Sequence, residues 1–317
     1  MRGRRWAILW LAVTIGFGAY AVRGVDLGEM RMAIARAEGG WLAASLGVLA
    51  VAIALRSLRW QCLFPANDRP SYGAVSKALL IGYFFNNVLP ARAGEAARVV
   101  ALARLEPISR ATAAGTVLVE RAYDLVVVVL LLVLLVPWLP HVSWLPQALT
   151  LLAVLVVVLT VAFILVHRHG DRPARLLLSP LRRLSSLSPA RIDLAAANLT
   201  AALATARAPR AAAIALTLTT VSWALLGFSF WLAVPALDLG LPLGAGLLVA
   251  IATGLGGVIP SGPAGIGVFE AATVVALSAY GISGTEALSY AVILHALNLF
   301  PFLVAGGVAL LWSARAE

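Results

Sequence analysis

The first residues that could do chemistry form a polar run inside an otherwise apolar segment: Asn86, Asn87, Arg92, Glu95 and Arg98. Arg92, Glu95 and Arg98 recur every three residues, so on a helix they would share one broad face. A guanidinium is a planar fork that suits phosphate, and one carboxylate between two guanidiniums leaves about one positive charge. We expect this run to bind an anionic lipid headgroup. The alternative is an ion pair at the membrane edge.

A second charged group, Glu120, Arg121 and Asp124, directly precedes twelve consecutive Leu and Val residues. On a helix, Arg121 would reach Asp124 at the i+3 position, and Glu120 would lie one turn before Asp124. These side chains could supply counter-charge to Arg92 or Arg98, or relay protons. An interfacial anchor is an equally good interpretation.

The third group lies in the run GLGGVIPSGPAGIG, residues 254–267, which has six glycines and two prolines. Glycines let the backbone approach a ligand, and a helix starting at residue 268 would direct unpaired N–H groups toward it. We therefore expect an anion site with Glu270 as counter-charge, formed by Ser261, Gly262, Gly265 and Gly267. Glu270 also suits the first turn of a helix without any ligand.

The remaining polar residues have simpler interpretations. The run RSLRW, residues 56–60, is typical of an interfacial anchor whose arginines extend toward the headgroups. His295 and Asn298 are three residues apart and favour a packing hydrogen bond. The histidines and Cys62 lack metal-ligand spacing, and the glycines do not follow the nucleotide-binding pattern. We expect no metal, no cofactor and no catalytic residue.

Composition places the elements that carry these residues in a membrane. Of the 317 residues, 62% are hydrophobic and 12% charged, whereas a soluble domain has about a quarter charged. The chain is therefore expected to be all-α, a polytopic transmembrane helical bundle in one domain, residues 1–317. The formal net charge is +10, and the basic loop at 167–210 favours anionic lipid headgroups over nucleic acid.

Six apolar runs are long enough to cross a hydrocarbon core of about 30 Å. They cover residues 6–22, 41–55, 112–136, 148–166, 211–234 and 288–312. Two further runs, 73–105 and 243–280, are interrupted by the polar and Gly/Pro-rich stretches above. Irregular backbone at membrane depth must be buried in protein or line a wet cavity. We expect each interrupted run to be a hairpin of two short helices.

Positive charge predicts the orientation, because cytoplasmic loops carry the excess of arginine. Arg2, Arg4 and Arg5 place the N-terminus inside. The loop 167–210, with eight arginines and two aspartates, should also lie inside. A single crossing by residues 73–105 would place it outside, so this run must enter and leave the membrane on the same side. The C-terminus then also lies inside, and the hairpins enter from opposite sides, as in inverted-repeat transporters. Pairs of full spans would satisfy the charges equally, and simple helix kinks are the alternative for each Gly/Pro run.

In these motifs the chain resembles the family built around the transmembrane, flippase-like region of lysylphosphatidylglycerol synthase. The motifs are R-x-x-R-W from Arg56, N-x-L-P-x-R-x-G-E-x-x-R from Asn87, E-R-x-x-D from Glu120, and the turn ending in Glu270. The family usually has Pro-Gly-Gly-Leu-Gly in that turn, where this chain has Ala264 for the first glycine. The resemblance implies movement of an amphiphilic lipid between leaflets. It does not imply lysyl transfer, and we expect a free-standing member without the synthase domain.

The sequence thus predicts a bacterial inner-membrane protein, not an enzyme, that translocates an anionic or phosphate-bearing lipid in envelope lipid or glycan assembly. Its expected partners are anionic lipid headgroups and enzymes of envelope lipid or glycan synthesis. One alternative is a membrane transferase with Glu95 or Glu120 as general base. The other is a non-catalytic scaffold that docks through the loop 167–210.

Overall fold

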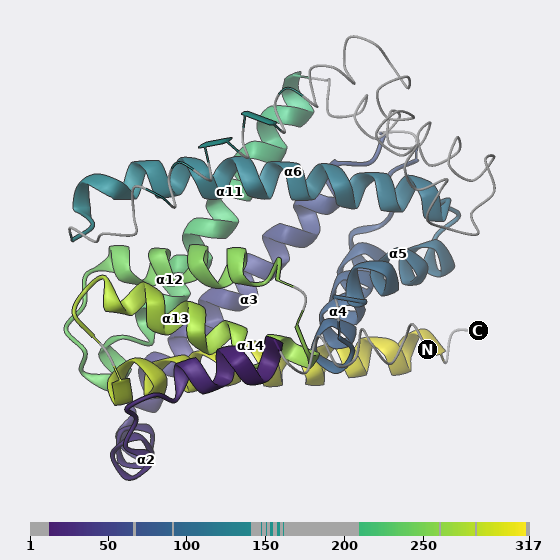
Figure 1. The fold of residues 1–317 in the computed structure, drawn as a ribbon. Coiled ribbons are helices and arrows are strands. Elements are labelled where there is room, and N and C mark those ends of the chain that lie inside the picture. The colour runs from purple at the N-terminus through teal and green to yellow at the C-terminus, as the bar shows by residue number, and fades with distance from the viewer. Residues whose placement is uncertain are drawn as a thin grey trace, which may run out of the picture.

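The computed structural model describes residues 13–65, 68–90, 92–140, 209–259, 261–282 and 284–314, with isolated positions between 147 and 161. Within these residues the chain forms helices, turns and loops and no strand (Figure 1). The expectation of an all-α protein is therefore confirmed for the described part of the chain. The start of the first predicted span, most of the span 148–166, the loop 167–210 and both termini lie outside the described residues.

A helix at 13–21 comes first, and the others follow it in the order shown in Figure 1. They are α2 (Leu27–Arg36), α3 (Gly39–Cys62), α4 (Tyr72–Val88), α5 (Gly94–Leu105), α6 (Arg110–Leu135), α11 (Pro209–Leu232), α12 (Leu243–Gly256), α13 (Val268–Ser278) and α14 (Gly284–Ala314). Short 3₁₀ turns follow α6 at Val136–Trp138, follow α11 at Pro235–Leu237 and precede α13 at Pro263–Gly265.

Hydroxyl and carboxylate caps define where several helices begin. Ser71 Oγ accepts from Ala74 N at 3.2 Å before α4, and Ser109 Oγ accepts from Thr112 N at 2.9 Å before α6. Such a cap pairs an amide that the first helical turn leaves unsatisfied. The polar residues at these boundaries thus explain why the apolar runs start as helices at these positions.

Both interrupted runs consist of two helices joined by an irregular tip. Residues 89–93 separate α4 from α5, and residues 257–267 separate α12 from α13. We call these two stretches the first tip and the second tip. The paired helices contact each other, and α4 and α5 approach so closely that a Cβ at Gly94 would stand 1.9 Å from Gly82 O. Only glycine at position 94 permits this contact.

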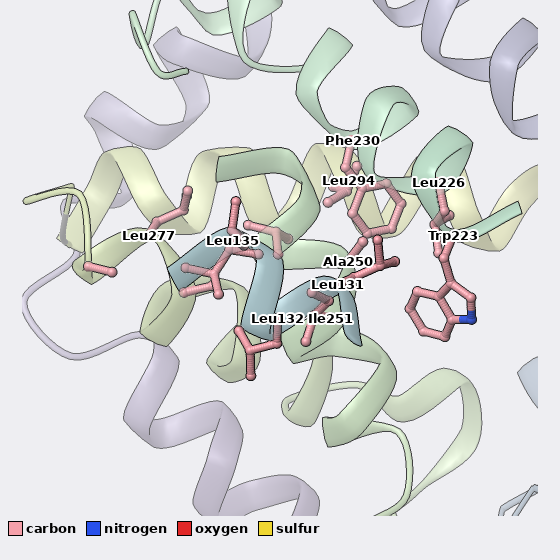
Figure 2. Packing of buried hydrophobic residues seen from close by; sticks show 14 of the residues in the cluster. Leu131, Leu132, Leu135, Trp223, Leu226, Phe230, Ala250, Ile251, Leu277 and Leu294 are labelled. Carbon is pink, nitrogen blue, oxygen red and sulfur yellow. The ribbon is translucent and has the colours of Figure 1, made fainter. Parts of the chain in front are cut away.

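The main hydrophobic core joins α6, α11, α12, α13 and α14. Figure 2 shows Leu131, Leu132 and Leu135 of α6 together with side chains of the other four helices: Trp223, Leu226, Phe230, Ala250, Ile251, Leu277 and Leu294. In Figure 1, α12 and α13 lie between α6 and α14. The second tip is therefore held by helices that share one buried core.

Three helices within the described residues are long and apolar enough to cross a membrane: Gly39–Cys62, Arg210–Leu237 and Gly284–Ser313. They coincide with the predicted spans 41–55, 211–234 and 288–312, although the first extends further than expected. The structure therefore has the helices that a membrane protein requires.

Candidate functional site

A buried ionic network forms where α3 and α5 meet α6. Glu120 is 3% exposed, and its carboxylate lies 2.7 Å from Arg59 Nη2 and 3.1 Å from Arg98 Nη1. Asp124 accepts hydrogen bonds from Arg121 Nη1 at 3.1 Å and Trp223 Nε1 at 3.1 Å, and pairs with Arg59 at 2.5 Å. Three guanidiniums thus converge on one turn of α6.

The prediction that Arg59 and Trp60 form an interfacial anchor is wrong. Arg59 is 1% exposed and Trp60 is completely buried, with its Nε1 donating to Thr116 Oγ1 at 3.0 Å. The physical reason is that two carboxylates on α6 compensate the Arg59 charge, so its side chain does not need to reach the headgroups.

Glu95 closes the network from α5. Its carboxylate lies 2.6 Å from Arg98 Nη2 and 2.6 Å from Arg121 Nη2. The network contains Arg59, Arg98 and Arg121 against Glu95, Glu120 and Asp124, so its formal charges cancel. Arg98 is 2% exposed and packs over the Trp60 ring at 4.8 Å, which leaves it no surface for a headgroup. The expected headgroup-binding role of Arg98 is therefore replaced by a role in this network.

Arg92 does not lie on the same helical face as Glu95 and Arg98. Helix α5 begins at Gly94, and Arg92 lies in the first tip with a left-handed φ of 54°. Asn86 fixes the tip, because its Oδ1 accepts from Gly94 N at 2.9 Å. A non-glycine residue in this conformation costs about 1–2 kcal/mol, which persists only where the surroundings enforce it. The Arg92 side chain is exposed, and it forms no ion pair among the described residues.

The second tip is tied to α13 and α14 by a carboxylate and a histidine. Glu270 Oε2 accepts from Gly267 N at 2.7 Å, so Glu270 occupies the first-turn position that its place in the sequence suggests. Its Oε1 lies 2.5 Å from His295 Nδ1, and His295 Nε2 lies 3.2 Å from Ala264 O. Gly262 N donates to Thr14 Oγ1 at 3.0 Å. Glu270 and His295 thus hold the tip in place.

A cavity of about 290 Å³ lies between the two tips. Of the predicted binding residues, seven line it: Asn86, Asn87, Arg92, Glu95, Ser261, Gly262 and Gly265. Arg121 and Asp124 line it from α6. Gly267 instead faces the first helix, where a Cβ would stand 2.5 Å from Thr14 O. Glu120, Arg98 and Glu270 are not among the lining residues.

Arg56, which the sequence interpretation assigned to an interfacial anchor, also lines the cavity. Its Nη1 donates to Tyr83 Oη at 3.3 Å, and its guanidinium lies over the Trp223 ring at 5.6 Å. It forms no ion pair among the described residues, so Arg56 and Arg92 are the two lining arginines without a carboxylate partner there. The arginines that line the cavity therefore outnumber its carboxylates, Glu95 and Asp124, and give it a net positive charge.

Residues 7–306 match a family model described as the lysylphosphatidylglycerol synthase TM region. The chain belongs to this family. The matched residues include the whole ionic network, both tips and the cavity. No curated protein matches the chain. As a member of the lysylphosphatidylglycerol synthase TM-region family, the chain is a membrane protein of lipid or envelope metabolism.

The turn before α13 contains a strained position. Ala264, where the resemblance implies a glycine, has a left-handed φ of 57°. Its carbonyl nevertheless contacts His295, so the turn keeps its place beside the cavity. The substitution therefore costs conformational energy without removing the turn.

Sequence reasoning missed Arg56, Tyr83, Trp223, Thr253 and Asn298 as cavity residues. The R-x-x-R-W motif was a usable signal, because two arginines so close to an apolar run require counter-charges. The four other residues carry no pattern that distinguishes them from packing residues.

Proposed function

We propose that this protein binds an anionic, phosphate-bearing lipid in the cavity between the two tips and moves it from one leaflet to the other. The observation that carries the proposal is the pair of uncompensated arginines, Arg56 and Arg92, in a cavity that both interrupted segments border. An unpaired charge in a low-dielectric site is costly unless a ligand compensates it. A phosphate provides that compensation in the bidentate geometry that arginine favours.

A second cavity supports an amphiphilic ligand. It has a volume of about 630 Å³, is apolar, and lies among the first helix, α12 and α13, with Leu132 contributed by α6. Val268 lines both cavities. The smaller cavity, at about 290 Å³, lies at the low end of the volumes of ligand pockets, about 300–1,000 Å³, and we assign it to the headgroup. We assign the apolar cavity to a hydrocarbon chain of the same lipid.

The proposed membrane arrangement has six spans and two re-entrant hairpins that enter from opposite sides, with both termini in the cytoplasm of a bacterial cell. The helix pairs α4–α5 and α12–α13, each bent at an irregular tip beside a polar cavity, support it. Irregular backbone is tolerated at membrane depth where it lines such a cavity. Inverted-repeat transporters place their substrates at such a site.

We propose that the protein moves its lipid without forming or breaking a covalent bond. Its partners are proposed to be enzymes of envelope lipid or glycan synthesis. The two carboxylates weighed as general bases support this view. Glu120 is buried between Arg59 and Arg98, and Glu95 lies between Arg98 and Arg121. A carboxylate paired with two guanidiniums is a poor proton acceptor.

Translocation by purified protein in vesicles tests the proposal. An anionic lipid with a fluorescent acyl chain is placed in the outer leaflet, and its loss from the albumin-extractable pool is followed over time. Wild-type protein should accelerate the loss relative to empty vesicles, and Arg92→Ala should abolish the acceleration. Arg104→Ala, which changes an exposed arginine of α5, should retain it. Equal rates for Arg92→Ala and wild type would refute the proposal.

A further inference from the structure

We infer that the headgroup bound in the cavity is a phosphate monoester, a group with close to two negative charges, rather than a phosphodiester or an amine-bearing headgroup. This inference rests on the proposed function and names its substrate class. It rests on two observations. Arg56 and Arg92 line the same cavity. The two carboxylates of that cavity, Glu95 and Asp124, already pair with Arg121.

The two acidic residues of the cavity are fully engaged by the protein. Glu95 pairs with Arg98 and Arg121, both at 2.6 Å. Asp124 pairs with Arg59 and Arg121 and accepts from Trp223 Nε1. Neither carboxylate forms an ion pair with Arg56 or Arg92 among the described residues, and both are already paired with other arginines.

Arg56 is fixed by its neighbours and retains an unused donor. Its Nη1 donates to Tyr83 Oη, and its guanidinium lies over Trp223. Its Nε is buried and has no hydrogen-bond partner among the described residues. A buried donor without a partner costs free energy, so the protein does not fully satisfy this guanidinium.

Arg92 brings the second charge to the cavity. Its backbone is held in a left-handed turn, and its guanidinium lies against Gly257 at the end of α12. The partial negative charge of a helix C-terminus holds a cation there but supplies less than one full charge. Arg92 therefore keeps a positive charge that a ligand anion can pair with.

The negative charge of the headgroup decides how well it balances Arg56 and Arg92. A phosphodiester brings one negative charge and leaves one arginine uncompensated. A phosphate monoester brings about 1.5 to 2 negative charges at pH 7 and three strong acceptor oxygens, enough for both guanidiniums. An ammonium headgroup would add positive charge to a site that already has an excess.

Binding in mixed micelles tests the inference with two probes that share the same acyl chains, phosphatidic acid and phosphatidylglycerol. At pH 7.5, phosphatidic acid should bind the wild-type protein about tenfold more tightly, the equivalent of one charge-assisted hydrogen bond. At pH 5, below the second ionisation of the monoester near pH 6, the difference should disappear, whereas binding of phosphatidylglycerol should stay constant.

Variants of Arg56 test whether this residue causes the preference for phosphatidic acid over phosphatidylglycerol. Arg56→Gln should lose the preference for phosphatidic acid and keep its affinity for phosphatidylglycerol, because Arg92 remains. Arg56→Lys, which keeps the charge, should keep a preference and tests the inference if Arg56→Gln does not fold. Arg104→Gln should behave like the wild type. Inorganic phosphate should compete far more weakly than phosphatidic acid, because it has no chain for the apolar cavity.

Equal affinities for the two lipids at pH 7.5, or a preference that survives Arg56→Gln, would overturn the inference. So would inorganic phosphate that binds as tightly as phosphatidic acid. If the affinities are equal but vesicles still translocate phosphatidylglycerol in an Arg92-dependent manner, the inference fails and the proposed function stands. If no anionic lipid binds or moves, both fail.

Discussion

Arg92 Nη2 occupies space that only a glycine at position 257 leaves open, since a Cβ at Gly257 would stand 1.9 Å from this nitrogen. The guanidinium thus extends from the first tip to the end of α12, where Gly257 begins the second tip. The two tips are separated by more than 160 positions in the sequence, yet one side chain connects them. We regard this contact as the structural basis of the cavity.

Gly257→Ala should displace Arg92 without unfolding the protein. Gly257 has a right-handed φ of −61°, which alanine adopts freely, and the obstructing atom is the end of a flexible side chain. We expect lipid translocation to fall about tenfold, as for the loss of one charge-assisted hydrogen bond. The vesicle assay measures the rate, and a melting curve in detergent checks folding.

Gly47→Ala is the matched control, because a Cβ at Gly47 in α3 meets nothing within 4 Å. The double variant Gly257→Ala/Arg92→Ala should be no slower than Arg92→Ala alone, since both changes act on one contact. Additive losses would show that Gly257 acts by another route.

Arg98→Ala should destabilise the protein, whereas Arg92→Ala should leave its stability nearly unchanged. Removing Arg98 leaves Glu95 and Glu120 with fewer buried partners, at a cost of about 3–5 kcal/mol. Arg92 is exposed and unpaired among the described residues, so its removal breaks no ion pair there. Unfolding in a denaturing detergent gives both free energies. Equal stabilities of the two variants would contradict the described network.

Ala264→Gly should stabilise the protein by about 1 kcal/mol, because glycine adopts the left-handed conformation of residue 264 without the steric cost of a Cβ. Ala272→Gly, in the regular helix α13, serves as the control and should destabilise by about 1 kcal/mol. A lower melting temperature for Ala264→Gly than for the wild type would argue against the left-handed turn.

Local pattern predicted the long apolar helices of the described residues and the interrupted segments, because apolar runs and Gly/Pro clusters act over short distances, but it did not predict α2. It also predicted the contact of Arg121 with Asp124, which lie one helical turn apart. It could not assign the arginines. Whether Arg56, Arg59, Arg92 or Arg98 faces the cavity depends on which carboxylate lies beside it, and Arg59 and Asp124 are 65 positions apart.

The turn geometry was equally inaccessible to local pattern. A period of three places Arg92 with Arg98 on a helix, but Pro90 and the start of α5 at Gly94 put Arg92 outside it. The proline disfavours helical backbone in the residue before it, and the helix restarts only after the tip. The actual partner of Arg92, Gly257, shares no sequence pattern with it.

The most direct test of the central claim is an experimental structure of the full chain in a lipid nanodisc that contains phosphatidic acid. We expect density for the phosphate between the guanidiniums of Arg56 and Arg92, within hydrogen-bond distance of both, and a chain in the apolar cavity. A phosphate bound elsewhere, with carboxylates paired to both arginines, would contradict the account.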